Sequence, residues 1–192
     1  MKIGLFFGSF NPVHVGHMII ANFMATQTDL EQVWMVVSPQ NPLKKKDSLA
    51  RDYDRLHLLR LAIGDNTRLK ASNIEFELPK PSYTIVTLTY LKEKYPDKEF
   101  ALIMGGDNLA TFHKWKNYEM ILANHEIYVY KRPKVEVGKF AKHSAVRMFD
   151  APMMDISASY IRQCRKEGKS VQYLVPDAVF ECLESSSLYR KK

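Results

Sequence analysis

One stretch near the start of the chain constrains the fold more than any other. Residues 3–7 form a short apolar run that includes two phenylalanines, which is the composition of a buried strand. The turn formers at positions 8–12 end this run, and a helix-like segment follows at residues 18–24. A strand, a loop of small residues and the start of a helix, in this order, typically form an anion-binding site in an α/β protein.

Two histidines, His14 and His17, lie between the loop and the helix. An imidazole donates a hydrogen bond to a phosphate oxygen, and its protonated form also neutralises charge. Gly8 allows a phosphate to approach the backbone closely, and the N–H groups and dipole of a helix N-terminus favour the phosphate's charge. Each feature alone is often only structural. Their combination after an N-terminal strand predicts a phosphate site, although the stretch is neither a Walker loop nor a G-x-G-x-x-G loop.

The remaining sequence alternates strands and helices. Apolar runs predict strands at residues 33–37, 69–72, 100–104, 127–130 and 146–149. Helices are predicted at residues 49–63, 83–95, 118–123, 158–167 and 176–183, with Ser82 and Ser157 as N-caps and Gly168 as a stop. This alternation favours a Rossmann-like α/β fold, a parallel sheet with helices on both faces. In such sheets ligands bind beyond the carboxyl ends of the strands.

The chain has 192 residues, a length that fits one domain with a substantial core. We expect a single domain over residues 1–192, with a small helical part at about residues 157–192. The net charge of +7 suits anionic partners, of which nucleic acid is one class. Apart from Lys44, Lys45, Lys46 and a basic tail, the positive residues are dispersed, so a nucleotide-binding enzyme explains the charge at least as well.

The cysteine pattern and the hydropathy indicate the compartment. Cys164 and Cys182 are the only cysteines and have no C-x-x-C spacing, so neither a disulfide framework nor a zinc ribbon is predicted. Free thiols fit a reducing cytoplasm. The chain begins with one lysine and then a strand rather than a signal peptide, and no apolar run approaches the ~20 residues of a membrane span. We expect a cytoplasmic protein without a membrane partner.

The stretch from Gly8 to His17 resembles the G-G-x-F-D-P-x-H-x-G-H signature of nucleotidyltransferases. The best match in that superfamily is the group of bacterial nicotinate (nicotinamide) mononucleotide adenylyltransferases, and later segments match in order over nearly the whole chain. Ser9 replaces Gly and Asn11 replaces Asp, but both substitutes are small and polar, so we expect the loop shape to survive. The resemblance implies an ATP-binding set of Gly8, Ser9, Phe10, His14 and His17.

A segment near the carboxyl terminus resembles the family's second signature, I-S-S-T-x-I-R. Ser157, Ser159 and Arg162 occupy its polar positions, with Ser159 in place of Thr. The hydroxyls and the helix N-terminus offer a second phosphate cradle, and the planar guanidinium of Arg162 lies one turn away. A serine-capped helix with an arginine is common, so the segment alone would be structural. Together with the first loop, it implies the opposite wall of a triphosphate site.

Gly105 and Asp107 follow the strand predicted at residues 100–104 and are similar to the family's G-x-D-x-L motif. A carboxylate in this place can accept hydrogen bonds from two ribose hydroxyls, and small residues before it leave room for a sugar or a base. The resemblance implies that both residues bind ATP. Without the resemblance, Asp107 is equally well interpreted as a helix N-cap.

Two segments are assigned to the acceptor mononucleotide. The segment that ends at Lys44 is similar to the family's P-x-x-x-P-x-K segment, and this resemblance implies that Lys44 holds the acceptor phosphate. Lys45 or Lys46 could share this role, and a triple lysine is often only a solvated loop. Tyr83 and Thr84 belong to an S-Y-T segment that contacts the nicotinate end of the mononucleotide in the family, and a helix N-terminus suits its carboxylate.

Trp115 is the third acceptor feature and matches the tryptophan downstream of the family's G-x-D-x-L motif. It stands between two lysines in a polar stretch, whereas a lone tryptophan is more often part of a core. Because it has few apolar neighbours in the sequence, we interpret it as a stacking plate for the pyridine ring. His113 is interpreted as a surface residue.

The resemblance implies transfer of AMP from ATP to nicotinate mononucleotide, which gives nicotinate adenine dinucleotide and pyrophosphate in NAD synthesis. The substrate phosphate attacks the α-phosphorus directly, so catalysis consists of alignment and charge stabilisation. The catalytic residues are expected to be His14, His17, Lys44 and Arg162. Magnesium is expected on the ATP phosphates, with water and phosphate as most of its ligands and no metal site in the protein itself.

Other functions remain open from the sequence. His14 and His17 have the i, i+3 spacing of metal ligands, but no third ligand is suitably placed, which argues against zinc. A nucleic-acid-binding or nucleotide-sensing protein fits the charge but lacks an RNP-like strand or a helix-turn-helix pattern. Adenylyl transfer to phosphopantetheine, or cytidylyl transfer, fits the first loop but not the S-Y-T segment or Trp115. The oligomeric state and the preference between the acid and the amide form of the pyridine are not determined.

Overall fold

The computed structural model describes residues 1–39, 49–132, 135–136 and 138–191. Within these ranges the strands form one parallel sheet in the order β3-β2-β1-β4-β5-β6. The strands are β1 Lys2–Gly8, β2 Gln32–Val37, β3 Leu69–Ser72, β4 Glu99–Gly105, β5 Ile127–Tyr130 and β6 Val146–Phe149. This is the strand order of a Rossmann fold, so the predicted fold class is confirmed.

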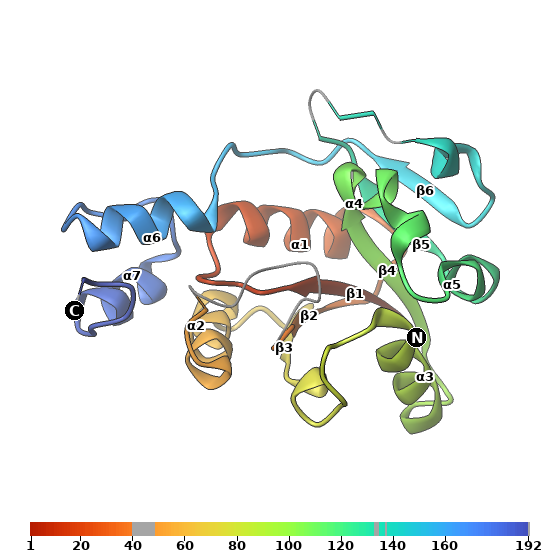
Figure 1. Ribbon diagram of the computed structural model, residues 1–192, viewed down its shortest axis with the longest axis horizontal. Helices are drawn as coiled ribbons and strands as arrows, with labels where there is room; N and C mark the ends of the chain where they lie inside the picture. The colour runs from red at the N-terminus through yellow and green to blue at the C-terminus, as the bar shows by residue number, and fades with distance from the viewer. Residues whose placement is uncertain (40–48, 133–134, 137, 192) are drawn as a thin grey trace.

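Helices cover both faces of the sheet (Figure 1). They are α1 Val15–Gln27, α2 Asp52–Ile63, α3 Thr84–Lys94, α4 Gly106–Ala110, α5 Tyr118–Asn124, α6 Ala158–Lys166 and α7 Asp177–Glu184. Three short 3₁₀ turns are η1 Ile74–Phe76, η2 Phe112–Lys114 and η3 Lys139–Lys142. Figure 1 shows α6 and α7 beyond the end of the sheet, where α7 contacts α2.

The sheet separates two apolar cores because successive strand residues point to opposite faces. In β2, Met35 and Val37 pack with the buried faces of α1, α2, α6 and α7, whereas Trp34 and Val36 pack with α3 and α5. Both faces are therefore covered, which explains why the inner strands β1, β2, β4 and β5 are mostly continuous apolar runs rather than alternating ones.

Predicted and observed elements agree closely for the strands and less closely at the helix ends. β3, β5 and β6 have the predicted bounds, and Ser157 caps α6 through its side chain as expected. The first helix begins at Val15, three residues before the predicted start. Tyr83, not Ser82, is the N-cap residue of α3, so the prediction for Ser82 is wrong. The short α4 and the 3₁₀ turns were not predicted, because so few residues carry no periodic signal.

The division into one domain over residues 1–192 with a C-terminal helical part stays a prediction. In the described part of the chain, none of the helices combines the length and the apolar character needed to cross a membrane.

Candidate active site

The candidate residues gather where the strand order reverses, at the carboxyl ends of β1 and β4. β1 pairs with β2 on one side and with β4 on the other, so the chain leaves β1 toward α1 and leaves β4 toward α4. A crevice at this switch point is where parallel α/β sheets bind ligands. Lys44, Lys45 and Lys46 lie outside the described residues, and their predicted role is not addressed by the structure.

The loop after β1 is shaped by the buried ring of Phe10. Phe10 has a φ of 42°, in the left-handed region, and its ring lies directly over Gly8. A Cβ atom added at Gly8 would come within 2.8 Å of the Phe10 Cζ atom. Gly8 is therefore needed to accommodate Phe10, a reason that differs from the predicted approach of a phosphate. Because its side chain is buried, Phe10 contributes to the site through the shape of the loop.

His14 and His17 form a stacked pair at the start of α1. Their ring centroids are 3.7 Å apart with an interplanar angle of 27°. The His14 backbone N–H donates to Nδ1 of His17 over 3.3 Å, so a neutral His17 carries its proton on Nε2. Gly16 makes room for this arrangement, since a Cβ there would lie 3.1 Å from Nδ1 of His14. The two histidines thus form one stacked pair of rings that can present imidazole N–H donors to a ligand.

His14 is neutral at pH 7, whereas the protonated form would be needed to neutralise phosphate charge. His14 is only 7% exposed. Burial, helped by the nearby charge of Arg132, lowers the pKa of His14 to about 4. At neutral pH His14 is therefore an uncharged hydrogen-bond donor in the unliganded protein, because burial disfavours the charged form.

The second signature lies against the first loop, although 151 positions separate the two contacting residues. Arg162, on α6, donates to the backbone carbonyl of Asn11 over 2.8 Å and to the Ser159 hydroxyl over 3.2 Å. Ser157 accepts from the backbone N–H of Tyr160 over 3.1 Å. The structure thus brings together the two segments that the sequence assigned to opposite walls of one site.

Asp107 and Gly105 meet an arginine that the sequence analysis missed. The Arg132 Nε atom lies 3.3 Å from a carboxylate oxygen of Asp107, and its guanidinium lies over the Tyr130 ring. A Cβ at Gly105 would lie 2.4 Å from the Asp107 carboxylate, so only glycine leaves space for this ion pair. The N-cap of α4 is Gly105, so Asp107 is not a cap. Arg132 follows β5 just as Asp107 follows β4, a positional signal that could have identified it.

Arg55, also missed, fixes the loops that leave β1 and β2. It is fully buried on α2 and donates to the backbone carbonyls of Ser9, Ser38 and Ala50. Asp52 pairs with the same guanidinium at 2.8 Å. A buried charge that is paired and hydrogen-bonded in this way holds the surrounding backbone in one geometry. Arg55 therefore supports the site without being exposed to it.

Asn11, the residue that departs from the family's aspartate, also has a structural role. It is buried, and its side-chain oxygen accepts from the backbone N–H of Ala50 over 3.1 Å and from the Tyr189 hydroxyl over 2.8 Å. Both donors are neutral, so an amide oxygen serves as well as a carboxylate. Asn11 thereby ties the first loop to the carboxyl-terminal segment.

The acceptor candidates lie together on the face covered by α3 and α5. Thr84 is the first residue of α3, and the ammonium group of Lys116 lies 4.6 Å from the centroid of the Tyr83 ring. Trp115 is half-buried and packs on Phe112 with ring centroids 5.2 Å apart. The expectation that Trp115 has few apolar neighbours is therefore wrong, because the fold brings the buried Phe112 against it. Its predicted role as a stacking plate stays a prediction.

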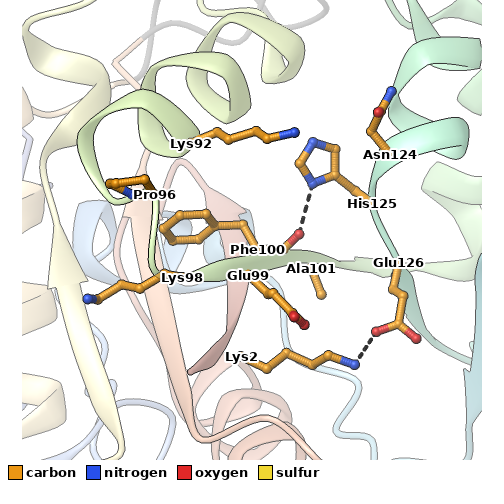
Figure 2. Close-up of a pocket in the computed structure, with 10 residues that line it drawn as sticks. All are labelled: Lys2, Lys92, Pro96, Lys98, Glu99, Phe100, Ala101, Asn124, His125 and Glu126. Carbon is orange, nitrogen blue, oxygen red and sulfur yellow. Dashed lines mark hydrogen bonds and ion pairs between the residues drawn. The ribbon is translucent and has the colours of Figure 1, made fainter.

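A cavity of about 420 Å³ opens at the opposite, amino edge of the sheet (Figure 2). Its lining includes Lys2, Lys92, His125 and Glu126, and two of these, Lys2 and Glu126, form an ion pair. His125 is held by a contact of 2.9 Å between its Nδ1 atom and the Phe100 carbonyl. None of the described candidate residues lines this cavity.

Among the residues that the structure describes, no group of three His, Cys, Asp or Glu side chains is close enough to hold a metal ion. His14 and His17 stack face to face, so their rings do not converge on one point as metal ligands do. Asp107, at the same edge, is paired with Arg132. The zinc alternative therefore has no support in this part of the chain.

Comparison with known proteins gives concordant matches. Residues 5–164 match the family described as Cytidylyltransferase-like. The chain is 54% identical, over all of both chains, to the probable nicotinate-nucleotide adenylyltransferase of Flavobacterium johnsoniae. It is 42% identical to the protein of the same name from Bacteroides thetaiotaomicron, over 94% of this chain and 90% of that one.

Solved structures share the fold. Plasmodium falciparum nicotinic acid mononucleotide adenylyltransferase complexed with NaAD superposes with a TM-score of 0.82 at 16% identity, covering 98% of this chain and 97% of that chain. A putative nicotinate-nucleotide adenylyltransferase from Vibrio parahaemolyticus gives a TM-score of 0.71 at 21% identity, covering 95% and 98% of the two chains.

Proposed function

The chain belongs to the nicotinate-nucleotide adenylyltransferase family, and we propose that the site at the carboxyl ends of β1 and β4 carries the family's reaction. This reaction transfers AMP from ATP to nicotinate mononucleotide, gives nicotinate adenine dinucleotide and pyrophosphate, and is a step of NAD biosynthesis. The observation that best supports this site is the contact of Arg162 with the Asn11 carbonyl. It sets a guanidinium beside the loop that ends in the stacked histidines.

The attacking group in this proposal is the acceptor's own phosphate. It is an anion at neutral pH, so no side chain has to act as nucleophile or general base. His14, uncharged, and His17, through its Nε2–H, donate hydrogen bonds to the triphosphate oxygens as charge develops. Arg162, with the hydroxyls of Ser157 and Ser159, stabilises the leaving pyrophosphate. Preorganised donors of this kind supply most of the rate enhancement in transfers that need no covalent intermediate.

The nucleoside part of ATP is assigned to the other side of the switch point. Gly105 leaves the space, and Asp107 accepts hydrogen bonds from the ribose hydroxyls. Because Asp107 is already paired with Arg132, a ribose would share the carboxylate with the guanidinium. Arg132 is then left within reach of a phosphate while it remains anchored on Tyr130.

The acceptor is assigned to α3 and the loop after β2. Lys44 would hold its phosphate, Tyr83 and Thr84 its carboxylated end, and Trp115 its ring. A helix N-terminus favours a carboxylate by ~0.3–1 kcal/mol, so we expect the acid to be preferred over the amide. Magnesium would arrive with ATP and neutralise phosphate charge, with phosphate and water as its ligands.

Two further assignments complete the proposal. A cytoplasmic location is supported by the two free cysteines, since disulfides are rare in that compartment. The proposed partners are ATP and nicotinate mononucleotide, with no nucleic acid and no membrane. Assembly into a homo-oligomer is left to direct measurement.

The experiment that tests the function is pyrophosphate release from MgATP with a panel of acceptors. Nicotinate mononucleotide should be the best acceptor, the amide mononucleotide weaker, and phosphopantetheine inactive. CTP in place of ATP should give little product. Turnover of phosphopantetheine without turnover of nicotinate mononucleotide would overturn the acceptor assignment, and salt-dependent binding of oligonucleotides without any turnover would overturn the enzyme.

A further inference from the structure

Glu75 is a buried carboxylic acid that the proposed mechanism does not use. It lies on η1, directly after β3, and is only 2% exposed. Its Oε1 atom accepts a hydrogen bond of 2.9 Å from the hydroxyl of Thr87, which is itself 1% exposed and belongs to α3. Glu75 therefore links the end of β3 to the second turn of α3 inside the protein.

Two more hydroxyls face the same carboxyl group. Burial is the largest effect on Glu75 and raises its pKa, whereas the hydroxyls of Thr87, of Ser38 after β2 and of Ser82 two residues before α3 lower it. The second carboxyl oxygen and the Ser82 hydroxyl are both buried, and neither has a well-formed hydrogen bond in the described part of the chain.

The two sides of Glu75 are not equally fixed. Ser38 is already held by Arg55, which donates to the Ser38 carbonyl over 3.0 Å. On the α3 side, the hydroxyl of Thr87 donates a well-formed hydrogen bond to Glu75. Burying a carboxyl group costs free energy that an apolar side chain of similar size would avoid. Packing alone therefore does not explain an acid at this point, whereas the need to fix α3 against the β2 loop does.

We propose that Glu75 is a positioning residue for the acceptor subsite and that it sets the N-terminus of α3 against Ser38 at the end of β2. This inference rests on the proposed function, in which Tyr83 and Thr84 bind the nicotinate end of the acceptor. Glu75 contacts neither ATP nor the reacting atoms. Its loss should therefore weaken binding of the acceptor and leave the ATP side unchanged.

The test is steady-state kinetics of three variants on the full chain. Glu75→Leu should raise KM for nicotinate mononucleotide about tenfold, the scale of one or two lost hydrogen bonds, with KM for ATP within about twofold of wild type. Glu75→Gln keeps an oxygen for Thr87 and an N–H for the serines, so it should restore most of the acceptor affinity. Thr87→Val, which removes only one donor, should give a smaller increase in the same direction.

The matched control is a variant with lower stability in which the contacts of Glu75 are unchanged. Leu91→Ala removes a buried side chain from α3 without touching the Glu75 contacts, and should lower Tm while leaving the KM for the acceptor unchanged. Equal increases in both KM values, or no increase in the Leu variant, would overturn the proposal. If Glu75→Leu does not fold, the KM values of Glu75→Gln and Thr87→Val for the acceptor and for ATP test the proposal instead. The turnover of nicotinate mononucleotide by the wild type is measured first and tests the proposed function. The KM values of the variants relative to wild type then test the role of Glu75.

Discussion

The two edges of the parallel sheet use charged side chains in opposite ways. At the amino edge, Asp29 accepts from Lys2 over 3.0 Å, from the Tyr128 hydroxyl over 2.7 Å and from Arg147 over 2.8 Å. At the carboxyl edge, Arg162 contacts a backbone carbonyl and a serine hydroxyl. The charges around Asp29 neutralise one another, whereas Arg162 is held by neutral groups, although Asp107 and Arg132 form an ion pair at the same edge.

We interpret the charged residues at the amino edge as stabilising the fold and those at the carboxyl edge as binding ligand. Asp29 already accepts from three donors, so this network has little left to offer a ligand. A guanidinium held by neutral acceptors keeps its net charge, and His14 at the same edge has a buried Nδ1 without a hydrogen-bond partner among the described residues. We therefore expect substitutions at the carboxyl edge to change turnover, and matched substitutions at the amino edge to change only stability.

The largest effect is expected for His17→Ala. Removing one well-placed hydrogen-bond donor to a developing charge lowers kcat by about 10²-fold or more, so the variant should be nearly inactive in pyrophosphate release while its circular dichroism remains native. His14→Ala should also be strongly damaging, because the two rings form one stacked pair.

His125→Ala is the matched control for this prediction. His125 is also a partly buried histidine, but it lies at the amino edge and contacts the Phe100 carbonyl (Figure 2). Its kcat should stay within about twofold of wild type. Near-normal turnover of a folded His17 variant would mean that the stacked pair is only a helix start, and the contrast between the edges would lose its strongest support.

Arg162→Lys should have the next largest effect. The substitution keeps the positive charge but loses the planar fork, which contacts Asn11 and Ser159 and would also contact the triphosphate. We expect kcat/KM for ATP to fall by about 10-fold to 150-fold, the value of one hydrogen bond to a charged group. Arg147→Lys at the amino edge is the control, and should leave ATP kinetics unchanged. Equal behaviour of the two variants would show that Arg162 only ties α6 to the first loop.

The fold could be predicted from the sequence because its signals are local. The run at residues 127–130 coincides with β5, which is buried throughout, since a strand buried on both faces needs a continuous apolar run. The meeting of the two signatures could also be predicted, because each lies after a strand or at a helix start. A parallel sheet brings such positions to one edge.

Other parts of the site depend on contacts that no local pattern encodes. Arg55 lies in an ordinary helix, and nothing near it in the sequence indicates that it reaches Ser9 and Ser38. The neutral state of His14 comes from burial, and the packing of Trp115 comes from Phe112, so both require the folded chain. Arg132 differs from these residues, because its position just after β5 is a signal that the sequence itself carries.

Trp115→Ala should raise KM for nicotinate mononucleotide while KM for ATP stays nearly unchanged. Stacking of a flat ring on an aromatic side chain is worth ~1–3 kcal/mol, so the increase should lie between about 5-fold and 150-fold. Because Trp115 also packs on Phe112, the variant should lose some thermal stability, which a Tm measurement quantifies. Trp115→Phe keeps a stacking ring and should recover most of the acceptor affinity. A tryptophan that serves packing alone would lower Tm and leave both KM values unchanged.

The smallest effect is expected at the amino edge, from Asp29→Asn. Burial opposes ionisation of Asp29, but hydrogen bonds from Tyr128 and Lys2 outweigh it and hold the pKa well below its usual range. Because ionised Asp29 is favoured in the folded state, its contribution is present above the ordinary pKa of about 3.9 and is lost as the pH falls through the folded value. Exposed ion pairs are worth up to about 1 kcal/mol, so Tm at pH 7 should drop by about 2–4 °C.

This difference in Tm between wild type and Asp29→Asn should begin to shrink as the pH falls below about 4, because Asp29 of the unfolded wild type then binds a proton while the folded protein keeps the charge. Asp65→Asn is the control, since Asp65 forms no ion pair in the described part of the chain and should leave Tm unchanged. Turnover of all three proteins should be equal at pH 7. A loss of activity in Asp29→Asn without a loss of stability would break the comparison, because a charge at the amino edge would then act on the chemistry at the other end of the strands.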